Sequence, residues 1–197
     1  MNDAIAAPTR AGRAAFAALV LGVICAYYAI FFLPPRLVGS NDPDRYYHLG
    51  LAAITAEHGL PRTLPQVEDL GWGHYFPDKE FLFHALTALA WKIGEAPAVL
   101  WLVPLLGAAI VLCLYTEASR QLKPLAASML VIVGVALTAG LLFRLSLLRP
   151  HLLSILVFVL LLMAVLRDRP RLAALAAAVF ALSYHAFIVV GFVIGAA

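Results

Sequence analysis

The run AAFAALVLGVICAYYAIFFL, residues 14–33, contains no charged side chain and is followed directly by Pro34-Pro35-Arg36. A bilayer core about 30 Å thick needs about 20 apolar residues per helix, and this run has that length. It is too long for the apolar part of a cleavable signal peptide, and no small-residue cleavage site follows it. The sequence therefore predicts a first transmembrane helix over residues 14–35.

The composition extends this interpretation to the whole chain. Of its 197 residues 63% are hydrophobic and 13% are charged, whereas a soluble domain is about 45–50% apolar and about 25% charged. The excess apolar surface is too large for one small core and requires lipid. We expect an all-α, polytopic membrane protein with about five transmembrane helices. After the first, the expected spans form a bundle within residues 96–197, namely 96–116, 125–143, 152–166 and 172–197.

The basic residues predict the orientation of these helices. A net charge of +3 would point to nucleic acid in a soluble protein, but here short basic tracts lie between apolar runs. With residues 1–13 in the cytoplasm, the tracts 117–123 and 167–171 also lie inside. Those two short connectors carry five basic residues against two in the short outer connector 144–149, as the positive-inside rule requires. The Ala/Leu-rich composition favours a bacterial inner membrane.

The polar segment 36–95 is then an outer loop, periplasmic or extracellular, and its pattern predicts two amphipathic surface helices. Asn41-Asp-Pro-Asp44 is typical of a helix start, and apolar residues recur at helical spacing until Gly59. The second helix, residues 80–93, is too short to span and is stopped by Gly94.

Acidic residues and histidines gather in this outer loop. It holds eight of the eleven acids and four of the six histidines. Asp44 and His48, at i and i+4, share a helix face and could act on one ligand or ion. A second group of candidate metal-binding or acceptor-binding residues comprises Asp42, Asp78, Glu80 and His84. The alternative is that these side chains only keep an exposed loop soluble, since HExxH, GxGxxG and P-loop motifs are absent.

Two arginines mark the outer end of a predicted span. Arg144 and Arg149 flank Leu-Ser-Leu-Leu, and Pro150-His151 follows. Guanidinium groups suit bidentate phosphate binding, so Arg144, Arg149 and His151 are candidates for holding a lipid phosphate. Contact with ordinary lipid headgroups is the alternative. His185 lies within the last apolar run, where an ionisable side chain is costly.

The order of these elements resembles membrane glycosyltransferases of the GT-C fold. The stretch Asn41-Asp-Pro-Asp-Arg-Tyr-Tyr-His48, continued to Glu57-His-Gly59, is similar to the first outer loop of oligosaccharyltransferase catalytic subunits. The stretch Tyr75-Phe-Pro-Asp-Lys-Glu-Phe-Leu-Phe-His84 is similar to the start of the second surface helix in protein mannosyltransferase-like members. The resemblance covers residues 14–170 in architecture and about 40 residues in motif.

This resemblance implies an activity and roles for particular residues. Family members transfer a sugar from a polyprenyl-phosphate-type lipid donor to an acceptor at the outer face. Asp44 matches the family's catalytic aspartate, with His48 as its polar neighbour, and a divalent metal, Mg²⁺ or Mn²⁺, is the implied cofactor. The chain departs from the family in the loop 144–151, which lacks the second acid that many members carry. The run ending at Ala197 suggests the N-terminal part of a longer enzyme.

Two other function classes stay open on the sequence alone. The missing second acid favours a non-catalytic module that binds the lipid carrier or assists assembly. A transporter or flippase fragment is less well supported, since only Ser183-Tyr184-His185, Gly134 and Gly140 offer features of the kind such proteins place at the bilayer midplane. In every case the expected partners are the bilayer and a lipid-linked sugar, and no nucleic acid.

Overall fold

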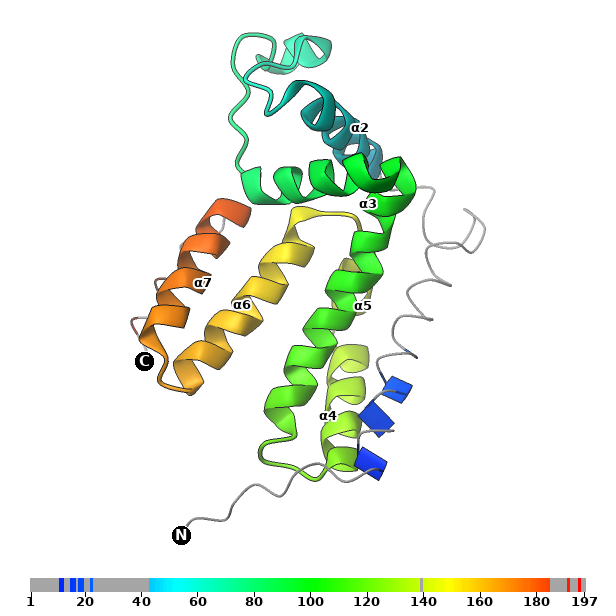
Figure 1. Cartoon of the computed structure of the whole chain (residues 1–197), viewed down its shortest axis with the longest axis vertical. Helices are drawn as coiled ribbons and strands as arrows, with labels where there is room; N and C mark the ends of the chain where they lie inside the picture. Colours follow the sequence, from blue (N-terminus) through cyan, green and yellow to red (C-terminus); the bar gives the residue numbers. More distant parts are fainter. Residues whose placement is uncertain are drawn as a thin grey trace. The chain divides into compact units, whose positions relative to one another are not determined.

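The computed structural model describes residues 11–12, 15–16, 18–19, 22, 43–138, 140–184, 191 and 195. Within these residues the chain is helical and contains no strand, as the sequence predicted. The elements, in chain order, are α2 (Pro43–His58), the 3₁₀ helix η1 (Pro65–Leu70), α3 (Phe81–Ala118), α4 (Pro124–Leu137), α5 (Leu141–Leu145), α6 (Pro150–Leu166) and α7 (Pro170–Ser183), drawn in Figure 1.

The chain forms two compact units. One comprises residues 1–41 and 103–147, and the other comprises residues 42–102 and 148–197. Helix α3 belongs to both, because the division falls between Leu102 and Val103. The second unit contains α2, η1, the first part of α3, α6 and α7, and it holds nearly all the residues that the sequence marks as chemically active.

Helix α2 confirms the first helix that the sequence predicted in this segment, and its place at the membrane surface stays a prediction. It begins at Pro43, with Asp44 in its first turn, and ends at His58. Proline suits a first helical position because its missing N–H is not needed there. Gly59 follows with φ of +79°, and its N–H donates to the Thr55 carbonyl at 3.0 Å. This left-handed residue ends the helix, as glycine commonly does.

Two glycines of this segment provide a matched pair of stability predictions. A Cβ at Gly50 or Gly59 would meet no atom within 4 Å, but only Gly59 has positive φ. We therefore expect Gly59→Ala to lower the free energy of unfolding by about 1 kcal/mol through backbone strain. Gly50→Ala, within α2, should raise it by up to about 1 kcal/mol. Thermal unfolding in detergent measures both changes. Equal shifts of the same sign in the unfolding free energy would contradict the left-handed conformation of Gly59.

The loop between α2 and α3 folds back on itself and is more ordered than the sequence indicated. η1 was not predicted. Two backbone hydrogen bonds join the chain before η1 to the chain after it. The Leu64 N–H donates to the Trp72 carbonyl at 2.7 Å, and the Phe76 N–H donates to the Arg62 carbonyl at 2.8 Å. Leu64 and Phe76 are buried against Leu51 of α2. These contacts fix the aromatic loop, including Trp72, against α2.

Helix α3 bends within the second unit. Gly94 (φ −167°, ψ 32°) and Glu95 (φ 55°, ψ −147°) interrupt the helical backbone, at the glycine that the sequence marked as a stop, and Figure 1 shows the change of direction. The segment before the bend corresponds to the predicted second surface helix. In the part of the chain that the structure describes, α3 is the one helix long and apolar enough to cross a membrane, judged by length and composition.

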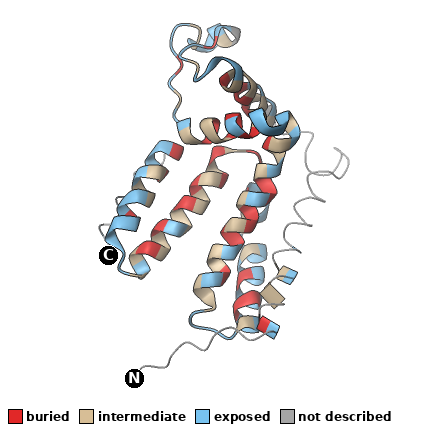
Figure 2. Cartoon of the chain, viewed as in Figure 1, coloured by how far each residue is buried: buried red, intermediate tan, exposed pale blue. Residues whose placement is uncertain are grey.

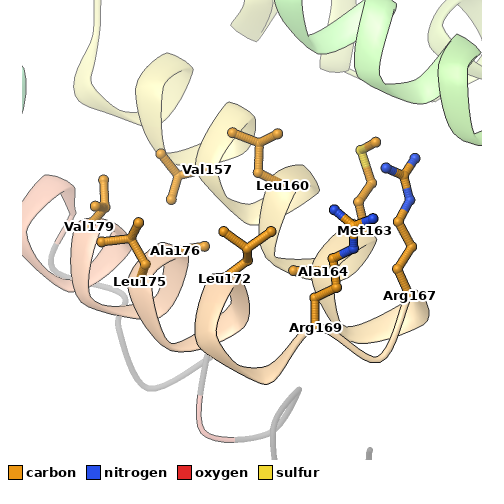
Figure 3. A pocket seen from close by; sticks show the side chains of 10 residues that line it. All are labelled: Val157, Leu160, Met163, Ala164, Arg167, Arg169, Leu172, Leu175, Ala176 and Val179. Carbon is orange, nitrogen blue, oxygen red and sulfur yellow. The ribbon is translucent and has the colours of Figure 1, made fainter.

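Helices α6 and α7 form an apolar hairpin. Its buried core consists of Val157, Leu161, Ala164, Ala173 and Phe180, and Figure 2 shows buried positions recurring along α6. The two helices also line a cavity of about 320 Å³ whose walls are almost entirely apolar (Figure 3). The sequence predicted one helix over residues 172–197, but α7 ends at Ser183 and Tyr184 is extended (φ −158°, ψ 142°).

In the first unit, α4 packs on the end of α3. Val111 and Tyr115 are buried with Ala127 and Val131, and the Phe16 ring stacks on Tyr115 at 4.7 Å between centroids. The predicted span 125–143 is interrupted, because α4 ends at Leu137 and Gly140 has φ of +75° before the short α5. Other expectations, namely most of the first transmembrane helix, Asp42 and His185, lie outside the described residues.

Candidate functional site

Three segments of the second unit bring the predicted site residues together. Helix α2 carries Asp44 and His48 one turn apart. The residues that open α3 supply Asp78, Glu80 and His84. The start of α6 supplies Arg149, its N-cap residue, and His151. The sequence placed the first two groups in separate clusters, and the structure unites them.

His48 and His84 form the buried centre of this site. His48 Nδ1 lies 3.2 Å from His84 Nε2, and the two residues are 4% and 1% exposed. On its other side His84 Nδ1 lies 2.8 Å from Asp78 Oδ1, which also accepts from the Glu80 N–H at 3.0 Å. Because an ionised carboxylate only accepts, His84 Nδ1 donates to Asp78. His84 Nε2 of a neutral ring then accepts from His48 Nδ1, which leaves Nε2 of His48 unprotonated.

Aromatic rings pack around the two imidazoles and help to exclude water from them. Phe83 meets the His48 ring edge to face at 5.2 Å, and Tyr47 meets it at 5.1 Å. The pKa of His48 is lowered to about 3, mainly by burial and in addition by the neighbouring His84, Arg149 and His151. Desolvation disfavours the charged form of a histidine. His48 is therefore neutral at neutral pH and has a nitrogen lone pair to offer.

Asp44 pairs with Arg149. Arg149 Nη1 lies 2.9 Å from Asp44 Oδ2, and the two side chains are 33% and 50% exposed. The start of α6 therefore meets the first turn of α2. Of the proposed phosphate-binding residues, Arg149 and His151 belong to this site. Arg144 lies on α5 in the other unit, so its part in binding a phosphate stays a prediction.

A cavity of about 570 Å³ opens on this pair. Its size is in the usual range for small-molecule sites. Tyr47 contributes a phenol whose pKa is raised to about 12, first by burial and then by the charges of Asp78, Glu80 and Asp44, so the hydroxyl stays protonated. The lining residues are Asp44, Tyr47, His48, Val67, Leu70, Trp72, Glu80, Arg149, Pro150, His151 and Tyr184.

Sequence reasoning missed part of this lining. Tyr47, Trp72 and Tyr184 were not singled out as site residues, although the aromatic loop 71–78 was a signal for Trp72. The contact between His48 and His84 was also missed, because it joins α2 to α3 through the back-folded loop. Asp42, proposed with the second group, lies outside the described residues.

Three of these residues have the ligand atoms for a metal ion. One atom each of His48, Glu80 and His84 lies within 4.8 Å of the others. Asp78 is not among them, because it contacts His84 at Nδ1, the ring nitrogen that does not face His48. The apolar cavity between α6 and α7 has no comparable group, since only Arg167 and Arg169 among its lining residues are charged.

Comparisons with models of known protein families, with curated proteins and with solved structures found no match.

Proposed function

We propose that this chain is part of a GT-C-like membrane glycosyltransferase that transfers a sugar from a polyprenyl-phosphate donor to an acceptor at the outer membrane face. The observation that carries the proposal is the 2.9 Å pair between Asp44 and Arg149 at the mouth of a cavity that both line. A carboxylate beside a guanidinium gives one group to accept a proton and one to hold a phosphate.

The proposed reaction divides between these two groups. The acceptor O–H or N–H attacks the anomeric carbon of the sugar, and the bond from that carbon to the phosphate oxygen breaks. The electron pair leaves with the lipid phosphate, whose charge Arg149 and His151 would stabilise. Asp44 takes the proton of the acceptor, as a general base. When the donor binds, before this reaction, Arg149 would give up its ion pair with Asp44 and bind the phosphate instead.

The cavity wall suits a sugar. Tyr47 and Trp72 both line it, with ring centroids 6.3 Å apart. Aromatic faces pack on the apolar side of a hexose, and the protonated Tyr47 hydroxyl is able to donate a hydrogen bond to it. The second acid that many family members carry is absent from the loop 144–151. Glu80 lines the same cavity as Asp44 and is our candidate for that role.

Exposed apolar surface supports the membrane-embedded arrangement. In the most apolar stretch of α3 only 44% of the residues are buried. More than half of these residues therefore expose surface that lipid or further protein must cover. The segment of α3 after its bend is about 34 Å long at 1.5 Å per residue, enough for the bilayer core. Helix α4 exposes a further set of large apolar side chains, namely Leu125, Met129, Leu130, Ile132, Val133 and Leu137. Lipid contact accounts for these surfaces, and five spans remain our proposal.

Labelling of single cysteines tests the proposed topology. Thr63 and Gln121 are both exposed, in the outer loop and in the basic connector between α3 and α4. With Cys25 and Cys113 replaced by Ser, Thr63→Cys should react with a membrane-impermeant maleimide on intact spheroplasts. Gln121→Cys should react only after permeabilisation. Reaction of both from the outside would contradict the proposed orientation.

Donor binding tests the proposed function itself. The full chain in detergent is titrated with a polyprenyl-phosphate hexose, and heat release is measured. We expect saturable binding that the same polyprenol without phosphate does not reproduce, because Arg149 recognises the phosphate. Equal binding of the phosphate-free polyprenol would mean that the chain binds only the hydrocarbon tail, and the proposal would fail.

A further inference from the structure

We propose that His48, Glu80 and His84 form a binding site for a transition metal ion of the zinc class. The ion would lie at the wall of the cavity that Asp44 and Arg149 also line. The inference deepens the proposed function, since it assigns a cofactor to the same cavity. It is nevertheless tested without any donor, so the two can fail separately.

The distances suit two nitrogen ligands on one ion. Nitrogens bound to a tetrahedral zinc at about 2.0–2.1 Å lie about 3.3 Å from each other. His48 Nδ1 and His84 Nε2 are 3.2 Å apart. Glu80 Oε2 lies 4.0 Å from the same His84 nitrogen, so a side-chain adjustment of less than about 1 Å would bring it to ligand distance. The hydrogen bond between the imidazoles would be exchanged for two bonds to the ion, and the proton of His48 would move from Nδ1 to Nε2.

Asp78 is placed as the supporting carboxylate of such a site. Metal-binding histidines commonly donate their other ring N–H to a carboxylate, which fixes the ring and its tautomer. Asp78 Oδ1 lies 2.8 Å from His84 Nδ1 on the side of the ring opposite His48. Asp78 is nearly buried, and its Oδ2 has no hydrogen-bond partner among the described residues. A buried carboxylate oxygen without a partner is costly, and an ion on the far side of His84 would offset the charge of Asp78.

The group of three combines one ligand behind the cavity wall with two ligands that line the cavity. His84 is 1% exposed and does not line the cavity, whereas His48 and Glu80 do. Three protein ligands leave a fourth position for water or substrate, as in zinc sites with two histidines and one glutamate. When bound, the ion would supply Lewis-acid charge inside the cavity.

The donor set distinguishes among metals. Two imidazoles suit zinc and its neighbours, whereas Mg²⁺ prefers oxygen ligands in octahedral geometry. The family resemblance implies Mg²⁺ or Mn²⁺, but Asp78 does not belong to the group of three found among the described residues. We therefore expect Zn²⁺ and Co²⁺ to bind far more tightly than Mg²⁺.

Metal titration of the full chain in detergent tests this site. After removal of metals, Zn²⁺ binding is followed by calorimetry, and Co²⁺ binding by its visible absorption, which is intense in four-coordinate sites. We expect one ion per chain. Asp78→Asn should weaken binding by about 10–100-fold, as loss of a supporting partner does, and His84→Ala and Glu80→Gln should weaken it by more.

His58→Ala is the matched control, since His58 lies on the same helix α2 but its side chain is 74% exposed and outside the group. It should leave affinity unchanged. Glu80→Gln keeps the test valid if a histidine variant fails to fold, because its side chain is 24% exposed and keeps its size. Affinity equal to wild type in folded Glu80→Gln and His84→Ala, or no uptake by the wild type, would overturn the inference and leave a metal-free Asp78–His84–His48 relay.

Discussion

Asp44→Asn is expected to reduce sugar transfer by about 10²–10⁴-fold, the usual contribution of a general base. Asparagine has nearly the same shape as aspartate but cannot take up the acceptor proton. The measurement is release of labelled sugar from a polyprenyl-phosphate hexose in proteoliposomes. Because Asp44 is half exposed at the helix start, we expect the variant to fold and insert normally.

The loss should appear in kcat and not in donor affinity. Before the donor binds, Arg149 forms an ion pair with Asp44. Replacing Asp44 by the uncharged asparagine removes this competition, so the phosphate should bind Arg149 at least as well. Glu57→Gln is the matched control, since Glu57 is an exposed acid on the same helix and does not line the cavity. Full transfer by Asp44→Asn would contradict the role of Asp44 as the general base.

Arg149→Ala is expected to weaken donor binding by about 10–100-fold, because hydrogen bonds to a charged group contribute about 1.5–3 kcal/mol. The readout is the dissociation constant of the polyprenyl-phosphate hexose from calorimetry. Arg149→Lys should recover only part of the affinity, because an ammonium group offers a point charge and not a planar fork.

Arg167→Ala provides the control for this prediction. Arg167 is the C-cap of α6, whereas Arg149 is its N-cap, so both changes remove one guanidinium from the ends of the same helix. In the proposed topology only Arg149 is at the outer face. Equal losses in the two variants would show a nonspecific charge effect and contradict the phosphate-binding role of Arg149.

Much of the fold was predictable because proline and glycine mark the ends of helices. Pro43, Gly59 and Gly94 set the limits of α2 and the bend of α3, and each has a backbone reason that the sequence displays. The all-helical class followed from the long apolar runs. Run length, however, does not specify where a helix stops inside an apolar stretch. The sequence therefore extended the helix of residues 172–197 past Ser183 and missed the interruption before Gly140.

The candidate site was predictable residue by residue but not as an arrangement. The spacing of Asp44 and His48 placed them on one face, and Asp78, Glu80 and His84 were recognisable as a group. What joins them depends on the back-folded loop, whose Leu64 and Phe76 bury against Leu51. No local pattern encodes that packing, nor the 2.9 Å contact between Asp44 and Arg149 from distant parts of the chain.

Turnover of a labelled donor by the wild-type chain in proteoliposomes tests the central claim most directly. The sugar of a polyprenyl-phosphate hexose carries the label, and its transfer from the lipid is followed with peptide, lipid and water as acceptors. The proposal predicts release of polyprenyl phosphate in step with transfer of the label to one acceptor. Saturable donor binding with no loss of label to any acceptor would contradict a glycosyltransferase.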